Sequence, residues 1–329
     1  MNMSDIKLPG LDEIYAARKR IQAVVRRTPL ARDAKLSEML GAPVYLKLEC
    51  LQITGAFKAR GAANKLLSLT EDEKKRGVIA FSTGNHGRAV AALSAELGIP
   101  AVICLSTRVP QWRVDAMRAL GAEVVAHGVS QDEAYGKALE IQEERGLTMV
   151  APFDDPYVLT GQGTIALEIM EDLPEVGQII VPLSGGGLFA GVAMAAKTVK
   201  PSIKMVGVSM EVAPAMIRSL EAGKPVEIPE KNSLADALLG GIGLDNRYTF
   251  ELTRRHIDQC ELVSEKEIAD GMFHAFDQQK LVVEGSGAVG ISAVLSGKIS
   301  GPGPVVIVVS GGNVDPRTLC AITAENYNL

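Results

Sequence analysis

The stretch GVIAFSTGNHGRAVAALSAELGIPAVICLS, residues 77–106, indicates the fold. It begins with a short apolar segment at 77–82, passes through a turn of glycine and small polar residues, and continues as an alanine-rich segment that ends at Gly98. A second short apolar segment follows at 100–106. Short apolar strands that alternate with helices are typical of a parallel sheet covered by helices. This stretch therefore predicts one strand–helix–strand unit of a doubly wound α/β fold.

The same alternation continues on both sides of this stretch. Further strands are predicted at 44–50, 122–127, 148–152, 178–184, 204–210, 261–264 and 304–310. Helices are predicted at 11–25, 62–69, 110–121, 131–145, 265–280 and 286–296. Two more are predicted, one that begins just after Gly161 and one that ends at Val199. Residues 223–247 have mixed polarity and many turn formers, which indicates a long surface excursion. The chain has 329 residues, more than one simple hydrophobic core usually holds, so two domains are expected.

Composition excludes several classes of protein. The net charge of −5, with no basic cluster, argues against nucleic-acid binding. No apolar run reaches the roughly 18 residues of a membrane span, and the N-terminus lacks the apolar core of a signal peptide. The four cysteines are far apart, without metal-ligand or disulfide spacing. We therefore expect a cytoplasmic protein with reduced thiols and no membrane partner.

Three turns follow predicted strands and carry groups suited to a ligand. SGGGL (184–188) opens a helix, and its glycines let backbone N–H groups converge into an anion cradle. STGNHG (82–87) offers hydroxyl and amide groups, and SGGN (310–313) ends the most apolar strand with a serine. In open α/β sheets ligands bind at these strand ends. Each turn alone also fits an ordinary strand–helix connection, a helix cap at Thr83 or Asn85, or a structural role for His86.

The segment TGAFKARGA (54–62) places Lys58 after an aromatic residue and among small residues. Such a setting suits a lysine that a flat ligand approaches closely. A lysine, a phosphate cradle, an asparagine loop and a serine at a strand end together describe a pyridoxal phosphate site, in which the lysine binds the cofactor covalently.

The motifs TGAFKARGA, STGNHG, GQGTIALEI (161–169), SGGGL and SGGN occur in the order found in the serine/threonine dehydratase family. The chain resembles this family over roughly residues 12–322. The resemblance implies the tryptophan-synthase-β-like fold, or fold type II: an α/β enzyme with two doubly wound parallel-sheet domains and pyridoxal 5'-phosphate in the cleft between them. It also implies a large cofactor-binding domain over 1–75 plus 155–329 and a small mobile domain over 76–154.

The resemblance assigns a role to each motif. Lys58 is the Schiff-base lysine and takes the α-proton of the substrate, Phe57 packs on the pyridine ring, and Asn85 donates to the ring hydroxyl oxygen. Ser310 binds the pyridine nitrogen. The phosphate is held by Ser184, Gly185, Gly186, Gly187 and Leu188. The substrate carboxylate is held by Ser82, Thr83, Gly84, Asn85 and His86.

Ser310 also favours one type of reaction. Its neutral hydroxyl does not keep the pyridine nitrogen protonated as an aspartate would, so a long-lived carbanion is disfavoured and β-elimination is favoured over transamination. We expect a lyase that removes water from a hydroxy amino acid such as L-threonine or L-serine, and releases a 2-oxo acid and ammonia. The alternatives are a serine racemase-like enzyme and a β-replacement enzyme similar to cysteine synthase.

Several positions refine this expectation. Serine racemases usually carry serine where Thr83 stands, as a second acid/base group, so Thr83 is a further catalytic candidate. Ser209 and Ala215 occupy positions where other members of the family place metal-binding carboxylates, so no metal site is expected. The run STGNHGRA, with Arg88, resembles the hydroxyectoine-utilisation branch, which adds a hydroxyectoine-derived amino acid to the candidate substrates. A homodimer or homotetramer is expected.

Overall fold

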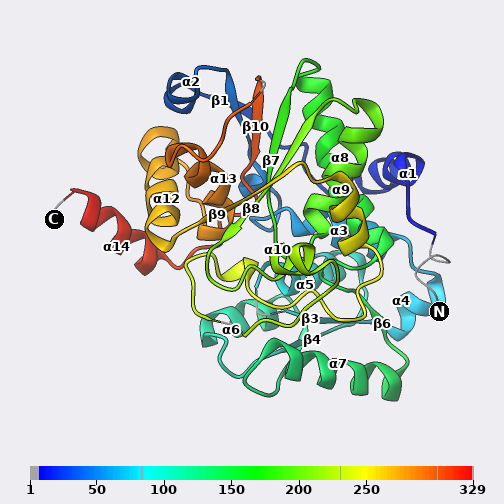
Figure 1. Cartoon of the computed structure of the whole chain (residues 1–329). Coiled ribbons are helices and arrows are strands. Elements are labelled where there is room, and N and C mark those ends of the chain that lie inside the picture. Colours follow the sequence, from blue (N-terminus) through cyan, green and yellow to red (C-terminus); the bar gives the residue numbers. More distant parts are fainter. Residues whose placement is uncertain (1–6, 83, 230, 302, 328–329) are drawn as a thin grey trace.

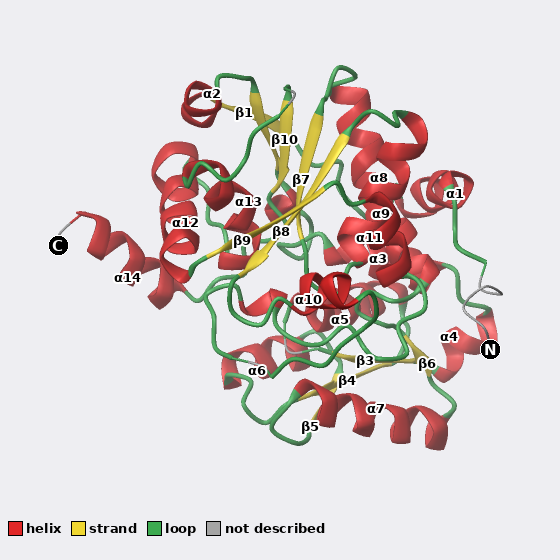
Figure 2. Ribbon diagram, viewed as in Figure 1, coloured by secondary structure: helices red, strands yellow, loops and turns green. Residues whose placement is uncertain are grey.

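Two β-sheets form the framework of the chain, and helices cover their faces (Figures 1 and 2). The computed structural model describes residues 7–82, 84–229, 231–301 and 303–327. The larger sheet has six strands, in the order β1 (Leu30–Asp33), β2 (Val44–Lys47), β10 (Val305–Val308), β7 (Gln178–Pro182), β8 (Lys204–Met210) and β9 (Gln259–Val263). Its strands pair in parallel, except that β1 pairs antiparallel with β2.

The smaller sheet is fully parallel. Its four strands have the order β5 (Glu123–Ala126), β4 (Ala101–Leu105), β3 (Val78–Phe81) and β6 (Thr148–Met149). All four lie between residues 78 and 149, and the two sheets share no strand. The α/β class with parallel sheets is thus confirmed. The division into domains at 76–154 stays a prediction.

Each face of the larger sheet buries its own hydrophobic cluster. Neighbouring residues of a strand point to opposite faces, so Ile179 of β7 joins one cluster and Ile180 joins the other. The first cluster is closed by α1 (Leu11–Ile21), α8 (Pro156–Asp172), α9 (Gly187–Val199), α10 (Ala215–Ala222) and α11 (Thr249–His256). The second is closed by α2 (Ala34–Leu40), α12 (Glu265–Gln279), α13 (Gly285–Leu295) and α14 (Pro316–Tyr327). Strands buried on both faces explain why the sequence shows them as continuous apolar runs.

The smaller sheet is covered in the same way. One face packs against α3 (Lys58–Leu67), α5 (Asn85–Leu97) and α6 (Gln111–Ala119), and the other against α7 (Gln131–Arg145). The short helix α4 (Glu71–Arg76) leads into β3 and carries a capping box between Thr70 and Glu73.

Two predicted helix starts are wrong, and glycines explain both. The helix predicted at 62–69 begins at Lys58, and the helix predicted after Gly161 begins at Pro156. The two helices, α3 and α8, cross at Gly61 and Gly161. A Cβ atom on Gly61 would lie 2.7 Å from the Val158 carbonyl oxygen, and one on Gly161 would lie 2.6 Å from the Arg60 carbonyl oxygen. These glycines therefore permit close helix packing and do not mark loops.

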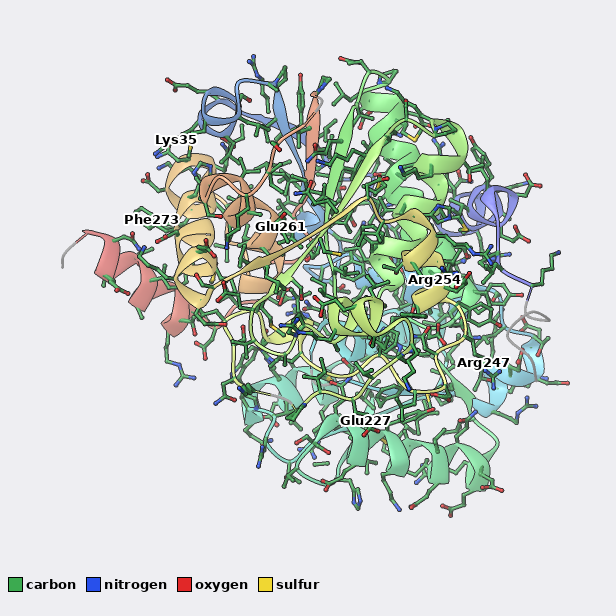
Figure 3. All side chains as sticks on the ribbon, viewed as in Figure 1. Lys35, Glu227, Arg247, Arg254, Glu261 and Phe273 are labelled. Carbon is green, nitrogen blue, oxygen red and sulfur yellow. The ribbon has the colours of Figure 1, made fainter. Side chains whose placement is uncertain are left out.

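Other boundaries differ in smaller ways. The strand predicted at 44–50 ends at Lys47 and continues as a 3-10 turn, η2 (Glu49–Leu51). The segment 223–247 is more than a surface excursion, because it contains the turn η3 (Asp236–Leu238) and the buried residue Ala235. In the view of Figure 3, Glu227 and Arg247 of this segment lie between the larger sheet and α7. Within the described ranges, no helix is long and apolar enough to cross a membrane.

Candidate active site

A large pocket opens at the carboxyl ends of β3, β7 and β10. It contains about 1270 Å³ of empty space, including its open mouth. All three predicted turns reach it, together with the lysine segment. The predicted site residues that line it are Phe57, Lys58, Ser82, Gly84, Asn85, His86, Ser184, Gly185, Gly186, Gly187, Leu188 and Ser310. Thr83 lies outside the described residues.

Lys58 is the first residue of α3, and its amine points into this pocket. Its Nζ donates a hydrogen bond to the carbonyl oxygen of Pro152 and lies 5.2 Å from the centre of the Phe57 ring. Among the described residues, no carboxylate pairs with this amine, and burial lowers the pKa of Lys58 to about 8. About a tenth of the amine is therefore uncharged at pH 7, far more than for an exposed lysine, and the uncharged amine is the state that acts as a nucleophile or base.

The lysine segment is hydrogen-bonded to the turn after β10. Phe57 N donates to the carbonyl oxygen of Ser310 at 3.0 Å, and Ala56 forms an isolated bridge with Gly311. This pairing holds Lys58 close to Ser310, although 252 residues separate them in sequence (310 − 58). The Ser310 hydroxyl is buried, and its one hydrogen bond within the described residues is a long contact, 3.4 Å, to the Ser286 carbonyl oxygen, so it is available to a ligand.

The turn at 184–188 has the form of an anion cradle. Gly186 has φ +86° and caps α9, whose first helical bond runs from Ala190 N to Gly186 O. Within the described part of the chain, no backbone N–H of 184–188 donates a hydrogen bond. Unpaired N–H groups at a helix start attract anions. The Ser184 hydroxyl instead donates to the Leu238 carbonyl oxygen at 2.8 Å, so this residue offers mainly its backbone.

Phe153 shapes the inner side of this cradle. A Cβ atom on Gly185 would lie 2.4 Å from the Phe153 ring, and one on Gly187 would lie 2.9 Å from Phe153 Cα. Only glycine leaves the backbone of this turn open toward the pocket while it packs on Phe153. The sequence alone did not single out Phe153.

The loop after β3 brings polar groups to the opposite wall. Asn85 begins α5, and Gly84 N donates to the Ser82 hydroxyl at 3.2 Å. The His86 ring is buried, and its Nε2 lies 2.7 Å from the Val150 carbonyl oxygen, which makes Nε2 the protonated nitrogen. Burial, and next the charge of Lys58, lower the pKa of His86 to about 3. His86 is therefore a neutral residue and contributes no positive charge to the pocket.

Glu284 is a functional candidate that sequence reasoning missed. It precedes α13 and is buried in the pocket wall, where its Oε1 accepts from Asn85 Nδ2 at 2.6 Å. Burial, and next the charge of Asp236, raise the pKa of Glu284 to about 7. The signal was a single carboxylate between an apolar run and glycine, LVVEGSGA. Such a pattern does not reveal a partner 199 positions away.

The mouth of the pocket carries a charged pair. Arg113 of α6 binds Asp236 of η3 at 2.9 Å, and its guanidinium lies 5.2 Å from the Trp112 ring centre. The excursion at 223–247 thus supplies part of the site. Among the described residues, no group of three or more histidine, cysteine or acidic side chains is placed to hold a metal ion.

Comparison with known proteins gives a consistent set of matches. Residues 21–311 match the family model described as pyridoxal-phosphate dependent enzyme. The chain is 47% identical over 314 residues to a putative threonine dehydratase of Sinorhizobium fredii, covering 95% of both chains. It is 46% identical over 306 residues to the L-threonine ammonia-lyase of Thermotoga maritima, covering 93% of this chain and 76% of that protein.

Solved structures are similar over the same length. Maize serine racemase has a TM-score of 0.90 and 35% identity, with coverage of 98% of this chain and 99% of that one. The processed form of threonine deaminase isoform 2 from Solanum lycopersicum has a TM-score of 0.86 and 36% identity, with coverage of 96% and 90%.

Proposed function

The chain belongs to the family of pyridoxal-phosphate-dependent enzymes, and from this premise we propose that it is a dehydratase acting on L-threonine or L-serine. The reaction is β-elimination of water from the hydroxy amino acid, and it ends in a 2-oxo acid and ammonia. The observation that carries the proposal is the shared pocket, in which the amine of Lys58, the 184–188 turn and the Ser310 hydroxyl face one space.

The residues of the pocket fit pyridoxal phosphate. The 184–188 turn offers unpaired N–H groups for a phosphate, and Gly185 and Gly187 leave it open beside Phe153. Lys58 offers an amine whose pKa of about 8 suits attachment to an aldehyde. Phe57 lies beside that amine as an aromatic surface, and the Ser310 hydroxyl is a neutral donor for a ring nitrogen.

When bound, pyridoxal phosphate supplies an electron-withdrawing ring that makes the α-proton of an attached amino acid acidic. Lys58 would accept that proton, and its buried amine with a depressed pKa supports this role. Ser310 offers a hydroxyl and no charge at the ring nitrogen, which favours elimination over transamination.

The start of α5 is the proposed site for the substrate carboxylate. Ser82, Gly84 and Asn85 surround a helix N-terminus, which favours negative charge. His86 is neutral, so the helix end and the loop N–H groups provide the attraction. A second acid/base role for Thr83 remains part of the proposal.

Racemisation of serine is the second candidate activity. The similarity to maize serine racemase supports it, because a dehydratase and a racemase on this fold share the first proton transfer from the α-carbon. The two activities differ in whether a proton returns on the opposite face. We further propose a cytoplasmic homodimer or homotetramer, and we keep hydroxyectoine-derived amino acids among the substrates to be tested. β-Replacement similar to cysteine synthase is the least supported alternative.

The test is a product assay on the purified protein loaded with pyridoxal phosphate. Ammonia and 2-oxo acid are measured with L-threonine, L-serine and a hydroxyectoine-derived amino acid, and D-serine is measured by chiral chromatography. We expect ammonia and 2-oxobutanoate from L-threonine, and Lys58→Ala should lower this rate by a factor on the order of 10²–10⁴ or more. Lys65→Ala, on the same helix but outside the pocket, is the matched control. A protein that releases D-serine but no ammonia would contradict the dehydratase proposal.

A further inference from the structure

The amide of Asn85 is held at both ends by residues outside the predicted site. Its Nδ2 donates to Glu284 Oε1 at 2.6 Å, and its Oδ1 accepts from Asn313 Nδ2 at 2.7 Å. An amide has two N–H groups on nitrogen and one oxygen. These two contacts therefore decide which way the amide faces. They leave one Nδ2–H of Asn85, a residue that lines the pocket, without an acceptor among the described residues.

Asn313 is itself locked in one orientation. Its Nδ2 also donates to the Thr54 carbonyl oxygen at 2.9 Å, and its Oδ1 accepts from Arg88 Nη1 at 2.9 Å. Its backbone N–H donates to Glu284 Oε2 at 3.2 Å. Turning the Asn85 amide over would set its oxygen against the carboxyl oxygen of Glu284 and its nitrogen against the nitrogen of Asn313. The network therefore permits one orientation only.

Two glycines make room for this network. A Cβ atom on Gly311 would lie 2.3 Å from Glu284 Oε1, and one on Gly55 would lie 2.6 Å from Asn313 Oδ1. Gly55 also has φ +78°, which favours glycine independently. Any side chain at either position would displace a member of the network.

We propose that Glu284 is a positioning residue that acts through Asn85: with Asn313, it directs the free Nδ2–H of Asn85 at the oxygen of the cofactor's ring hydroxyl. Because Asn85 meets this cofactor only under the proposed function, this role rests on that function. Glu284 accepts two N–H donors, which glutamine at the same position does not do, since its amide nitrogen would face a donor.

The charge of Glu284 should tune its hold on Asn85. The charged or titratable groups that face it are Asp236 from η3, Arg113 from α6 and Cys50 from η2. With a pKa of about 7, the carboxyl ionises within the usual working range. An ionised carboxylate accepts a hydrogen bond more strongly than a neutral acid, so Asn85 should be held more tightly as pH rises.

The test is a double-mutant cycle on cofactor affinity. Cofactor-free protein is titrated with pyridoxal phosphate, and binding is followed by the cofactor absorbance and by the fluorescence of Trp112, which lines the pocket and is the only tryptophan of the sequence. We expect Glu284→Gln to weaken binding about tenfold, the effect of one lost hydrogen bond, and to have no effect in the Asn85→Ala background. The component of the pH dependence of affinity that has its midpoint near 7 should disappear in Glu284→Gln, and the component from Lys58, with its midpoint near 8, should remain.

Glu267→Gln is the matched control, because Glu267 is a half-buried carboxylate of α12 bonded to Lys298, away from the pocket. It should bind the cofactor like the wild type. If Glu284→Gln does not fold, Asn313→Ala replaces it in the cycle and should show the same dependence on Asn85. If Glu284→Gln lowered cofactor affinity equally with and without the Asn85 side chain, the proposed role of Glu284 would be overturned, but the proposed function would stand. A wild-type protein that binds no pyridoxal phosphate would overturn the proposed function together with this role.

Discussion

Lys58 illustrates how much of this site depends on the surroundings of one side chain. The residue begins a helix, lies beside Phe57 and donates to the Pro152 carbonyl oxygen. A carbonyl group does not offset the cost of burying a positive charge as a carboxylate would, so the pKa of Lys58 falls to about 8. The sequence showed that Lys58 was unusual, but the depressed pKa depends on Pro152 and the pocket walls.

This pKa leads to a prediction for cofactor-free protein. The uncharged amine attacks an aldehyde, and the charged ammonium does not. The rate of covalent attachment of pyridoxal phosphate should therefore rise with pH, with a midpoint near 8, and then level off. Stopped-flow absorbance over a pH series measures this rate. A midpoint above about 10, the value for an exposed lysine, would contradict the effect of burial.

At the scale of elements, the crossing of α3 and α8 fixes where Lys58 points. Lys58 is the first residue of α3, and Gly61 follows within one turn. Its close contact with Gly161 of α8 is backbone against backbone, so neither helix can yield by a side-chain rotation. Arg60 lies between Lys58 and Gly61 in the sequence. Its guanidinium binds the carboxylates of Glu49 and Glu168 at 2.8 Å and 2.7 Å, which ties α3 to η2 and to α8.

Gly161→Ala tests this crossing. The added methyl group would meet the Arg60 carbonyl oxygen and Gly61 Cα, so we expect a loss of about 1–3 kcal/mol in the free energy of unfolding and weaker cofactor binding. Gly136→Ala in α7 is the matched control, because nothing lies within 4 Å of its Cβ position. It should stabilise the protein by about 0.5–1 kcal/mol. Urea unfolding measures both, and equal effects of the two substitutions would contradict the packing role of Gly161.

The same crossing shows what sequence reasoning reached and what it missed. Apolar strands buried on both faces and helices such as 131–145 are local patterns, so they could be read directly from the chain. The predicted helices began only after Gly61 and Gly161, because the role of these glycines is a contact between two helices 100 positions apart (161 − 61) and leaves no local pattern. β1 and α2 were missed because they are short and half-polar. The prediction reached the part of the pocket wall that is formed by turns of recognisable composition, and it missed lining residues such as Phe153 and Glu284.

At the scale of the whole molecule, the pocket joins the strand ends of both sheets. Asn85 and Arg88 from α5 bond to Glu284 and Asn313, and Arg113 from α6 binds Asp236. The first pair of contacts lies in the pocket wall and the last at its mouth. In each of these contacts the two residues are more than 100 positions apart in the sequence, so composition and spacing did not indicate the contacts.

Glu284 also gives the whole fold a pH dependence. Its pKa rises from 4.5 to about 7 on folding, so the folded state holds the proton more tightly than the unfolded chain does. This contribution to stability is full below about pH 4.5 and is lost as pH rises through 7, a change of about 3 kcal/mol. In urea unfolding of cofactor-free protein, the wild type should lose this amount relative to Glu284→Gln between about pH 5 and about pH 8. Parallel pH profiles of the two proteins would contradict the buried, neutral state of Glu284.

The central claim is that Lys58 binds pyridoxal phosphate in this pocket, and borohydride trapping tests it most directly. Borohydride converts the bond between a lysine amine and an aldehyde carbon into a stable secondary amine, which peptide mass spectrometry then locates. We predict one modified peptide, containing Lys58, and no trapping at Lys58 when the cofactor is omitted. A label on another lysine, or an unlabelled Lys58 in protein that shows the cofactor absorbance, would contradict the claim.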